Sequence, residues 1–126
     1  MKKIMTTKII LLSVVLLSSF ISVNLTSDNK DVIGTWNYAV PNAPAEYQKG
    51  QLILEDKEGE LSGYTKIGDY KNYIENPKLE NKTLTFTMFI EDTDVSFDLN
   101  FDHNKFSGKV TYTEGILDIT GVKIEK

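Results

Sequence analysis

The chain has 126 residues, a formal net charge of −4, no cysteine and no arginine. Without cysteine it is neither a lipid-modified lipoprotein nor a small secreted domain held together by disulfides. An acidic chain without a basic stripe is also poorly suited to bind nucleic acid or an anionic membrane surface.

Residues 1–27 have the features of a secretory signal peptide. Lys2, Lys3 and Lys8 precede an apolar run that begins at Ile9, which is the charge-then-apolar order of such signals. The run is short for a membrane anchor, which needs roughly 20 apolar residues, and no lysine cluster follows it. We therefore expect cleavage, no membrane span in the mature chain, export to the periplasm or the cell exterior, and a mature net charge of −7.

Residues 28–126 form one expected domain, because about a hundred residues suffice for a single core. From Ile33 onward, short runs of alternating apolar and polar residues recur about every dozen positions, without a sustained helical period. This pattern is typical of an all-β fold. The eight predicted strands are 33–40, 50–55, 60–67, 71–79, 83–90, 94–101, 105–112 and 115–124.

The links between these strands are short and rich in turn-forming residues, which favours hairpins between antiparallel neighbours. No link is long enough for a crossover helix. We predict an eight-stranded antiparallel up-and-down meander that closes into a small barrel, since closure removes exposed edges. Pro77, inside the fourth run, cannot donate to the ladder and so marks an edge or a bulge.

The alternation also predicts which side chains face the barrel interior. Trp36 is interpreted as a plug of the core. Gly63 in LSG and Gly108 in FSG occupy matching positions, either to let their strands bend or by coincidence. The predicted inward positions include Trp36, Tyr38, Val40, Leu84, Phe86, Met88, Ile90, Val95, Phe97, Leu99 and Phe101.

Several motifs occur in the order found in a known group of proteins. The chain opens with GTWNYAVPNAPAEYQKGQL from Gly34 and continues with LSG from Leu61, NKTLTFT from Asn81 and GILDITGVKI from Gly115. In this it resembles the lipocalin-like barrels of the calycin group, and more closely small secreted bacterial lipocalin-like proteins of unknown function. The resemblance implies a barrel whose first loop, PNAPAEYQK, either folds over the mouth as a lid or simply connects two strands at the end of the barrel. The disulfides, C-terminal helix and length of true lipocalins are missing, which argues against transport of a long lipid.

No catalytic constellation is visible in the sequence. His103 is the single histidine and lies in a DHN turn, so a zinc site or a nucleophile–base pair has nothing to build on. EDTD, from Glu91, lacks the spacing and glycine of a calcium-binding loop. We expect no enzyme, no cofactor and no metal site; a small hydrolase that uses two inward carboxylates is the weakest alternative.

The meander sorts the turns to two ends of the barrel. The loop 41–49 and the turns GDY, EDT and TEG lie at one end, where tyrosines accompany the acids. Such a rim suits a cationic or sugar-like ligand, although a solvated rim that only keeps the protein soluble has the same composition. The acids at this end are Glu46, Asp69, Glu91, Asp92, Asp94 and Glu114.

We predict a shallow cup at the acidic end, lined by Tyr38, Tyr47, Tyr70 and Tyr112, because large inward side chains fill the remainder of so small a barrel. The leading hypothesis is a non-enzymatic binding barrel whose partner is an unknown small molecule or envelope protein. The alternative is a structural or interaction module with a filled core.

Overall fold

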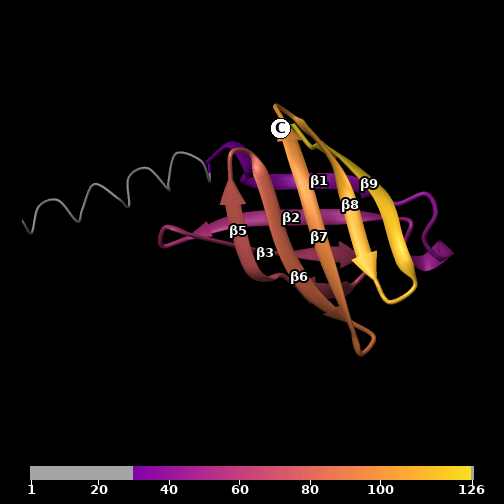
Figure 1. Ribbon diagram of the computed structural model, residues 1–126. Coiled ribbons are helices and arrows are strands. Elements are labelled where there is room, and N and C mark those ends of the chain that lie inside the picture. The colour runs from indigo at the N-terminus through magenta and orange to yellow at the C-terminus, as the bar shows by residue number, and fades with distance from the viewer. Residues whose placement is uncertain (1–29, 126) are drawn as a thin grey trace, which may run out of the picture.

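A computed structural model of the chain describes residues 30–125, and the expected signal peptide lies outside them. The described part is a β-structure with one short 3₁₀ turn, η2 (Ala45–Tyr47) (Figure 1). No helix in this part is long and apolar enough to span a membrane. The strands are β1 (Gly34–Ala39), β2 (Lys49–Lys57), β3 (Glu60–Ile67), β4 (Tyr70–Tyr73), β5 (Glu75–Glu80), β6 (Thr83–Ile90), β7 (Thr93–Asp102), β8 (Lys105–Tyr112) and β9 (Gly115–Lys123).

These strands form a single sheet in the order β4-β3-β2-β1-β9-β8-β7-β6-β5, and every neighbouring pair is antiparallel. Pairing of β1 with β9 brings the first and last strands together, so the sheet curls into a nearly closed barrel (Figure 1). The expected all-β antiparallel meander is confirmed. The expected number of eight strands is wrong, because nine are found in residues 30–125.

The ninth strand arises because the predicted strand 71–79 breaks at Ile74. Before the break β4 pairs with β3, and after it β5 pairs with β6, so the chain changes partner within one run. The Ile74 amide donates to the carbonyl of Gly63, with N and O 3.0 Å apart. Asn76 has a φ of 54° and the β5–β6 register shifts across Pro77, which confirms the expected edge position and bulge. The seam of the barrel therefore lies between β4 and β5.

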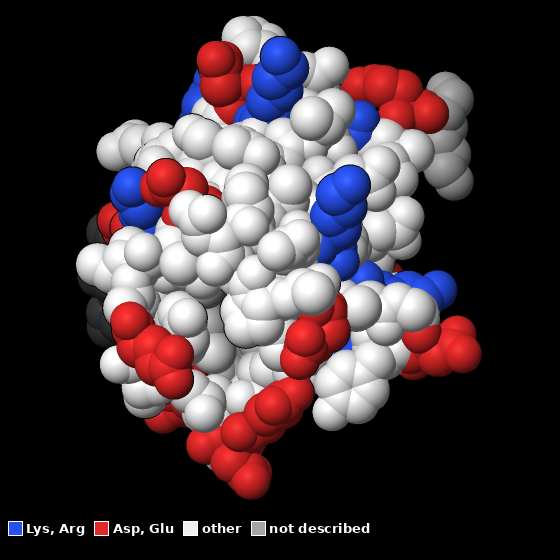
Figure 2. Space-filling model, turned by 90° about the vertical axis from the view of Figure 1, so that its right-hand side faces the viewer, with Lys and Arg blue, Asp and Glu red and all other residues white. Residues whose placement is uncertain are grey.

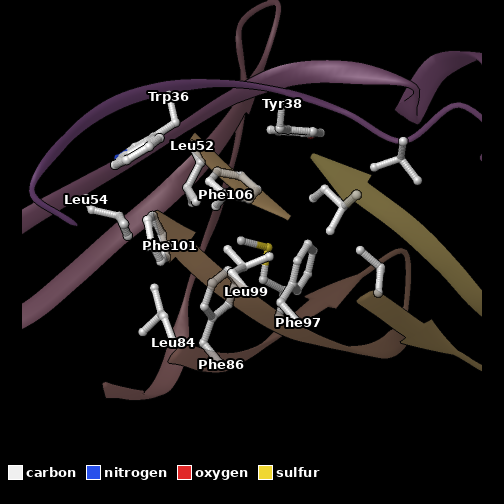
Figure 3. Packing of buried hydrophobic residues seen from close by; sticks show 14 of the residues in the cluster. Trp36, Tyr38, Leu52, Leu54, Leu84, Phe86, Phe97, Leu99, Phe101 and Phe106 are labelled. Atoms are coloured by element: carbon white, nitrogen blue, oxygen red, sulfur yellow. The ribbon is translucent and has the colours of Figure 1, made fainter. Parts of the chain in front are cut away.

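Aromatic side chains fill the end of the barrel away from the first loop. The Trp36 side chain is fully buried, and its ring centroid lies 4.9 Å from that of Phe101 and 5.6 Å from that of Phe106 (Figure 3). Phe86 and Phe97 stack farther along the barrel with centroids 4.7 Å apart. The expected inward alternation is confirmed in these strands, and aromatic rings in mutual contact occupy the core at this end.

Gly63 and Gly108 have a common structural role. A β-carbon at Gly63 would overlap the backbone carbonyl oxygen of Ile53 on β2, and one at Gly108 would overlap that of Asp98 on β7. In both places the neighbouring strand occupies the space of a side chain, and only glycine permits so close an approach. The repeated L-S-G and F-S-G pattern thus marks two positions where the backbone of the neighbouring strand comes very close.

Candidate functional site

A cavity of about 260 Å³ opens at the end of the barrel that carries the first loop. It lies beneath residues 40–47 and is bordered by the β6–β7 and β8–β9 turns. Phe97 and Val110 form part of its lining where the filled core ends. Most of its wall is apolar and consists of Val40, Ala43, Pro44, Ile67, Ile90, Val95, Phe97, Val110 and Leu117.

The charged groups of the cavity are all of one sign. Glu91 and Glu114 line it, whereas no lysine or histidine of residues 30–125 does so. Lys49 and Lys66, on the adjoining strands, line an outer depression that shares Tyr38 and Ile67 with the cavity. This separation follows from the strand period of two, because Thr65 and Ile67 face inward and Lys66 between them faces out.

Acidic side chains dominate part of the surface around the cavity. Figure 2 views this end of the molecule and shows acidic groups gathered over its lower part, with basic groups mainly above them and to the side. Glu91 and Asp92 form the two-residue β6–β7 turn, with φ values of 49° and 65°. Positive φ at both central residues is the geometry of a type I′ hairpin, which holds the Glu91 side chain at the rim.

The first loop is braced by its own hydrogen bonds. Val40 N donates to Gln48 O at 2.8 Å, and the Gln48 side-chain amide donates to Ala43 O at 2.9 Å. Ala43 is buried against the core cluster. Together with Pro44, which starts η2, these bonds give the loop one conformation over the cavity.

Tyr47 connects this loop to the opposite rim. Its hydroxyl donates a hydrogen bond to Glu91 Oε2. That bond, with smaller contributions from desolvation and from the negative charges of Glu91 and Glu46, raises the pKa of Tyr47 to about 12. The phenol therefore stays protonated at neutral pH and remains a donor, so loop and turn are linked across the mouth.

Tyr38 provides an unpaired polar group inside the mouth. Its side chain is only 9% exposed, and its hydroxyl makes no hydrogen bond to the described residues. Since no fully buried side-chain oxygen or nitrogen is left unpaired in residues 30–125, the hydroxyl must border open space. Burial raises the pKa of Tyr38 to about 12, and Gly50 leaves room for the phenol, because a β-carbon there would lie 2.7 Å from its oxygen.

The four tyrosines predicted for the cup are placed differently. Tyr38, Tyr47 and Tyr112 line the cavity, whereas Tyr70 does not. Tyr70 pairs with Ile67 in the β3–β4 register, but at the strand end its side chain is 62% exposed on the rim.

Four uncharged polar lining residues were not among the predicted site residues. Thr65, Asn72, Thr93 and Thr113 border the cavity, and the Thr65 hydroxyl donates to the Met88 sulfur at 3.7 Å. The alternation of β3 contains the signal for Thr65, since it follows Gly63 on the inner face. Asn72 was not predicted, because the sequence around the break at Ile74 does not show which residues of β4 face inward.

His103 lies at the other end of the barrel. Its side chain is 88% exposed, and Nδ1 lies 2.8 Å from Asp102 Oδ1. Within residues 30–125, no group of three or more His, Cys, Asp or Glu side chains is arranged to hold a metal ion. The described histidine thus belongs to an exposed turn remote from the cavity.

Comparisons with known proteins bear on the fold. No protein-family model and no curated protein matches the chain. A redesigned β-barrel matches the structure with a TM-score of 0.54 at 13% identity, covering 79% of this chain and 96% of the other. A variant of the fluorescent protein UnaG matches with a TM-score of 0.51 at 12% identity, covering 77% and 99%. At these identities the likeness concerns the fold alone, and it supports a β-barrel.

Proposed function

We propose that this protein is an exported, non-enzymatic barrel that binds a small molecule in the cavity at its acidic end. The observation that carries the proposal is an apolar cavity beneath a braced loop, with the unpaired hydroxyl of Tyr38 at its edge. Ligand sites typically combine such apolar walls with a few polar groups that fix orientation. Export is proposed from the charge-then-apolar order of residues 1–27.

The size of the cavity favours a compact ligand. Its volume of about 260 Å³ is at or below the small end of the roughly 300 to 1,000 Å³ of usual ligand pockets. Trp36, Phe101 and Phe106 occupy the far end of the barrel, so a long acyl chain has no path along the axis. A binding role without catalysis is supported by the lining, whose titratable groups are three tyrosines and two glutamates on separate turns.

The test is native mass spectrometry of the protein purified gently from its own host. We expect a retained small molecule that is released on denaturation and identified by its mass. Leu117→Phe, which adds bulk to the cavity wall, should abolish retention, whereas Ile116→Phe on the exposed outer face should not. Equal retention by both variants, or a mass equal to the polypeptide alone, would contradict the proposal.

An interaction module is the second candidate, because large apolar side chains are exposed on contacting strands. Tyr73 of β4 and Phe89 of β6 lie on the outer face of these strands and are more than half exposed. Chemical crosslinking in the host that attaches an envelope protein to this face, together with absence of a retained small molecule, would favour this function over ligand binding.

A further inference from the structure

The cavity has hydrogen-bonding groups and negative charge but no cationic group. Glu91 and Glu114 border it, and no lysine or histidine of the described chain lines it. A ligand carboxylate placed at this rim would gain no counter-ion and would face like charges, which disfavours its binding. A ligand ammonium at the same place would be attracted by the carboxylates of Glu91 and Glu114. The charge of the lining therefore discriminates between ligand classes.

We infer that the ligand is a small aromatic amine, with its protonated nitrogen at the mouth between Glu91 and Glu114 and its ring inside the apolar cavity. This inference rests on the proposed binding function and specifies its ligand class. The Tyr47 hydroxyl occupies Oε2 of Glu91, so Oε1 keeps free lone pairs for an ammonium donor. Tyr47 and Tyr112, both in the lining, offer aromatic faces that attract a cation near the rim.

The Tyr38 hydroxyl, beside Gly50 at the edge of the cavity, adds a second polar contact. It is unpaired in the described chain although its side chain is more than nine-tenths buried. A ring N–H or hydroxyl of the ligand would satisfy it, since a phenol both donates and accepts hydrogen bonds. A bicyclic ring that carries an N–H and a short aminoalkyl arm meets both requirements, and its size agrees with a cavity of about 260 Å³.

The experiment compares three ligands that share one ring and differ in their charge. Tryptamine, tryptophol and indole-3-propionate are titrated into the mature protein at pH 7 and low salt by calorimetry. We expect one-to-one binding of tryptamine, about threefold to tenfold weaker binding of tryptophol, and still weaker binding of indole-3-propionate. Added salt should weaken tryptamine binding and leave tryptophol binding unchanged.

Charge variants locate the ammonium. Glu114→Gln and Glu91→Gln should each weaken tryptamine binding severalfold and change tryptophol binding by less than about twofold. Glu114 has no hydrogen bond to the first loop among the described contacts, so its variant separates charge from loop position. Glu60→Gln, at the exposed start of β3 on the opposite end, is the matched control and should alter neither ligand.

Tryptophol or indole-3-propionate binding as tightly as tryptamine, or equal losses for tryptamine and tryptophol in Glu114→Gln, would overturn the amine ligand while leaving a small-molecule site in place. Absence of binding by all three would also overturn it, and the retained mass from host-purified protein would then judge the binding function separately.

Discussion

The indole nitrogen of Trp36 donates a hydrogen bond to the backbone carbonyl of Val32, with N and O 3.0 Å apart. Val32 ends the helical residues 30–32, and both side chains are almost completely buried. The bond satisfies the polar atom of an aromatic ring that otherwise packs against Phe101 and Phe106. The filled end of the barrel is thus fastened to the segment that precedes β1.

Trp36→Ala should severely destabilise the domain. Removal of a buried aromatic side chain typically costs about 3 to 5 kcal/mol, and a domain of this size has a free energy of unfolding of about 5 to 15 kcal/mol. Urea denaturation followed by circular dichroism measures the loss. Val122→Ala, at a half-exposed outward position, is the control. An unchanged midpoint in the Trp36 variant would show that the indole is not a core residue.

Gly108→Ala should also destabilise the fold, through the backbone rather than through the core. Its new methyl group would overlap the carbonyl oxygen of Asp98, and forced separation of packed groups typically costs about 1 to 3 kcal/mol. The neighbouring Ser107 is exposed, so Ser107→Ala is the matched control. Thermal unfolding should show a lower Tm only for the glycine variant; equal values for both would refute the close crossing.

Tyr38 and Tyr47 should ionise late, at about pH 12, because burial raises the pKa of Tyr38 and the Glu91 hydrogen bond raises that of Tyr47. Their folded pKa values exceed the unfolded value of about 10. Their contribution to stability is therefore complete below about pH 10 and is lost as the pH rises toward 12. Ultraviolet titration of tyrosinate should show one fewer late group in each of Tyr38→Phe and Tyr47→Phe.

Tyr47→Phe should loosen the first loop with little effect on global stability. The bond to Glu91 is at the surface, where such contacts contribute about 1 kcal/mol or less. Hydrogen exchange of residues 41–48 should become faster, whereas exchange in β7 and β8 should not change. Tyr73→Phe, on the outward face of β4, provides the comparison. The same loop exchange in both variants would exclude Tyr47 as the link.

His103→Asn should leave the free energy of unfolding within about 0.5 kcal/mol of the wild type, as is usual for surface changes. The imidazole is exposed and contacts only the adjacent Asp102 among the described interactions. Asn also tolerates the φ of 60° found at this turn. Chemical denaturation and ligand titration provide the measurements, and a lost ligand affinity would show that this end of the barrel participates in binding.

The alternation of residues was sufficient to predict the meander and most of its inner face. Phe97 and Leu99, for example, face inward, and Asp98 between them faces out. The break at Ile74 was not predictable in position, because the hydrogen-bond partner changes from β3 to β6 within one run of residues. Pro77 indicated an irregularity, but a strand partner is a long-range property that local pattern does not contain.

The order of the turns along the chain was sufficient to predict at which end of the barrel the cavity lies. The polar groups that line the cavity were predictable only in part. Counting hairpins brought Glu91 and Glu114 to the same end as Tyr47, which the structure shows. The unpaired hydroxyl of Tyr38 depends on the absence of any side chain at Gly50 opposite it, and such space emerges only from packing. Tyr70 was predicted to line the cavity but does not, because the sequence does not show that this first residue of β4 is exposed at the rim.

The seam between β4 and β5 makes the barrel a split ring. Across it, the covalent chain through Ile74 replaces a ladder of hydrogen bonds. A closed ring can widen only by breaking ladder bonds, whereas a split ring can widen by bending its strands. Asn72 of β4 borders both the seam and the cavity, so the circumference of the mouth is adjustable at low energetic cost on that side and is fixed by continuous ladders elsewhere.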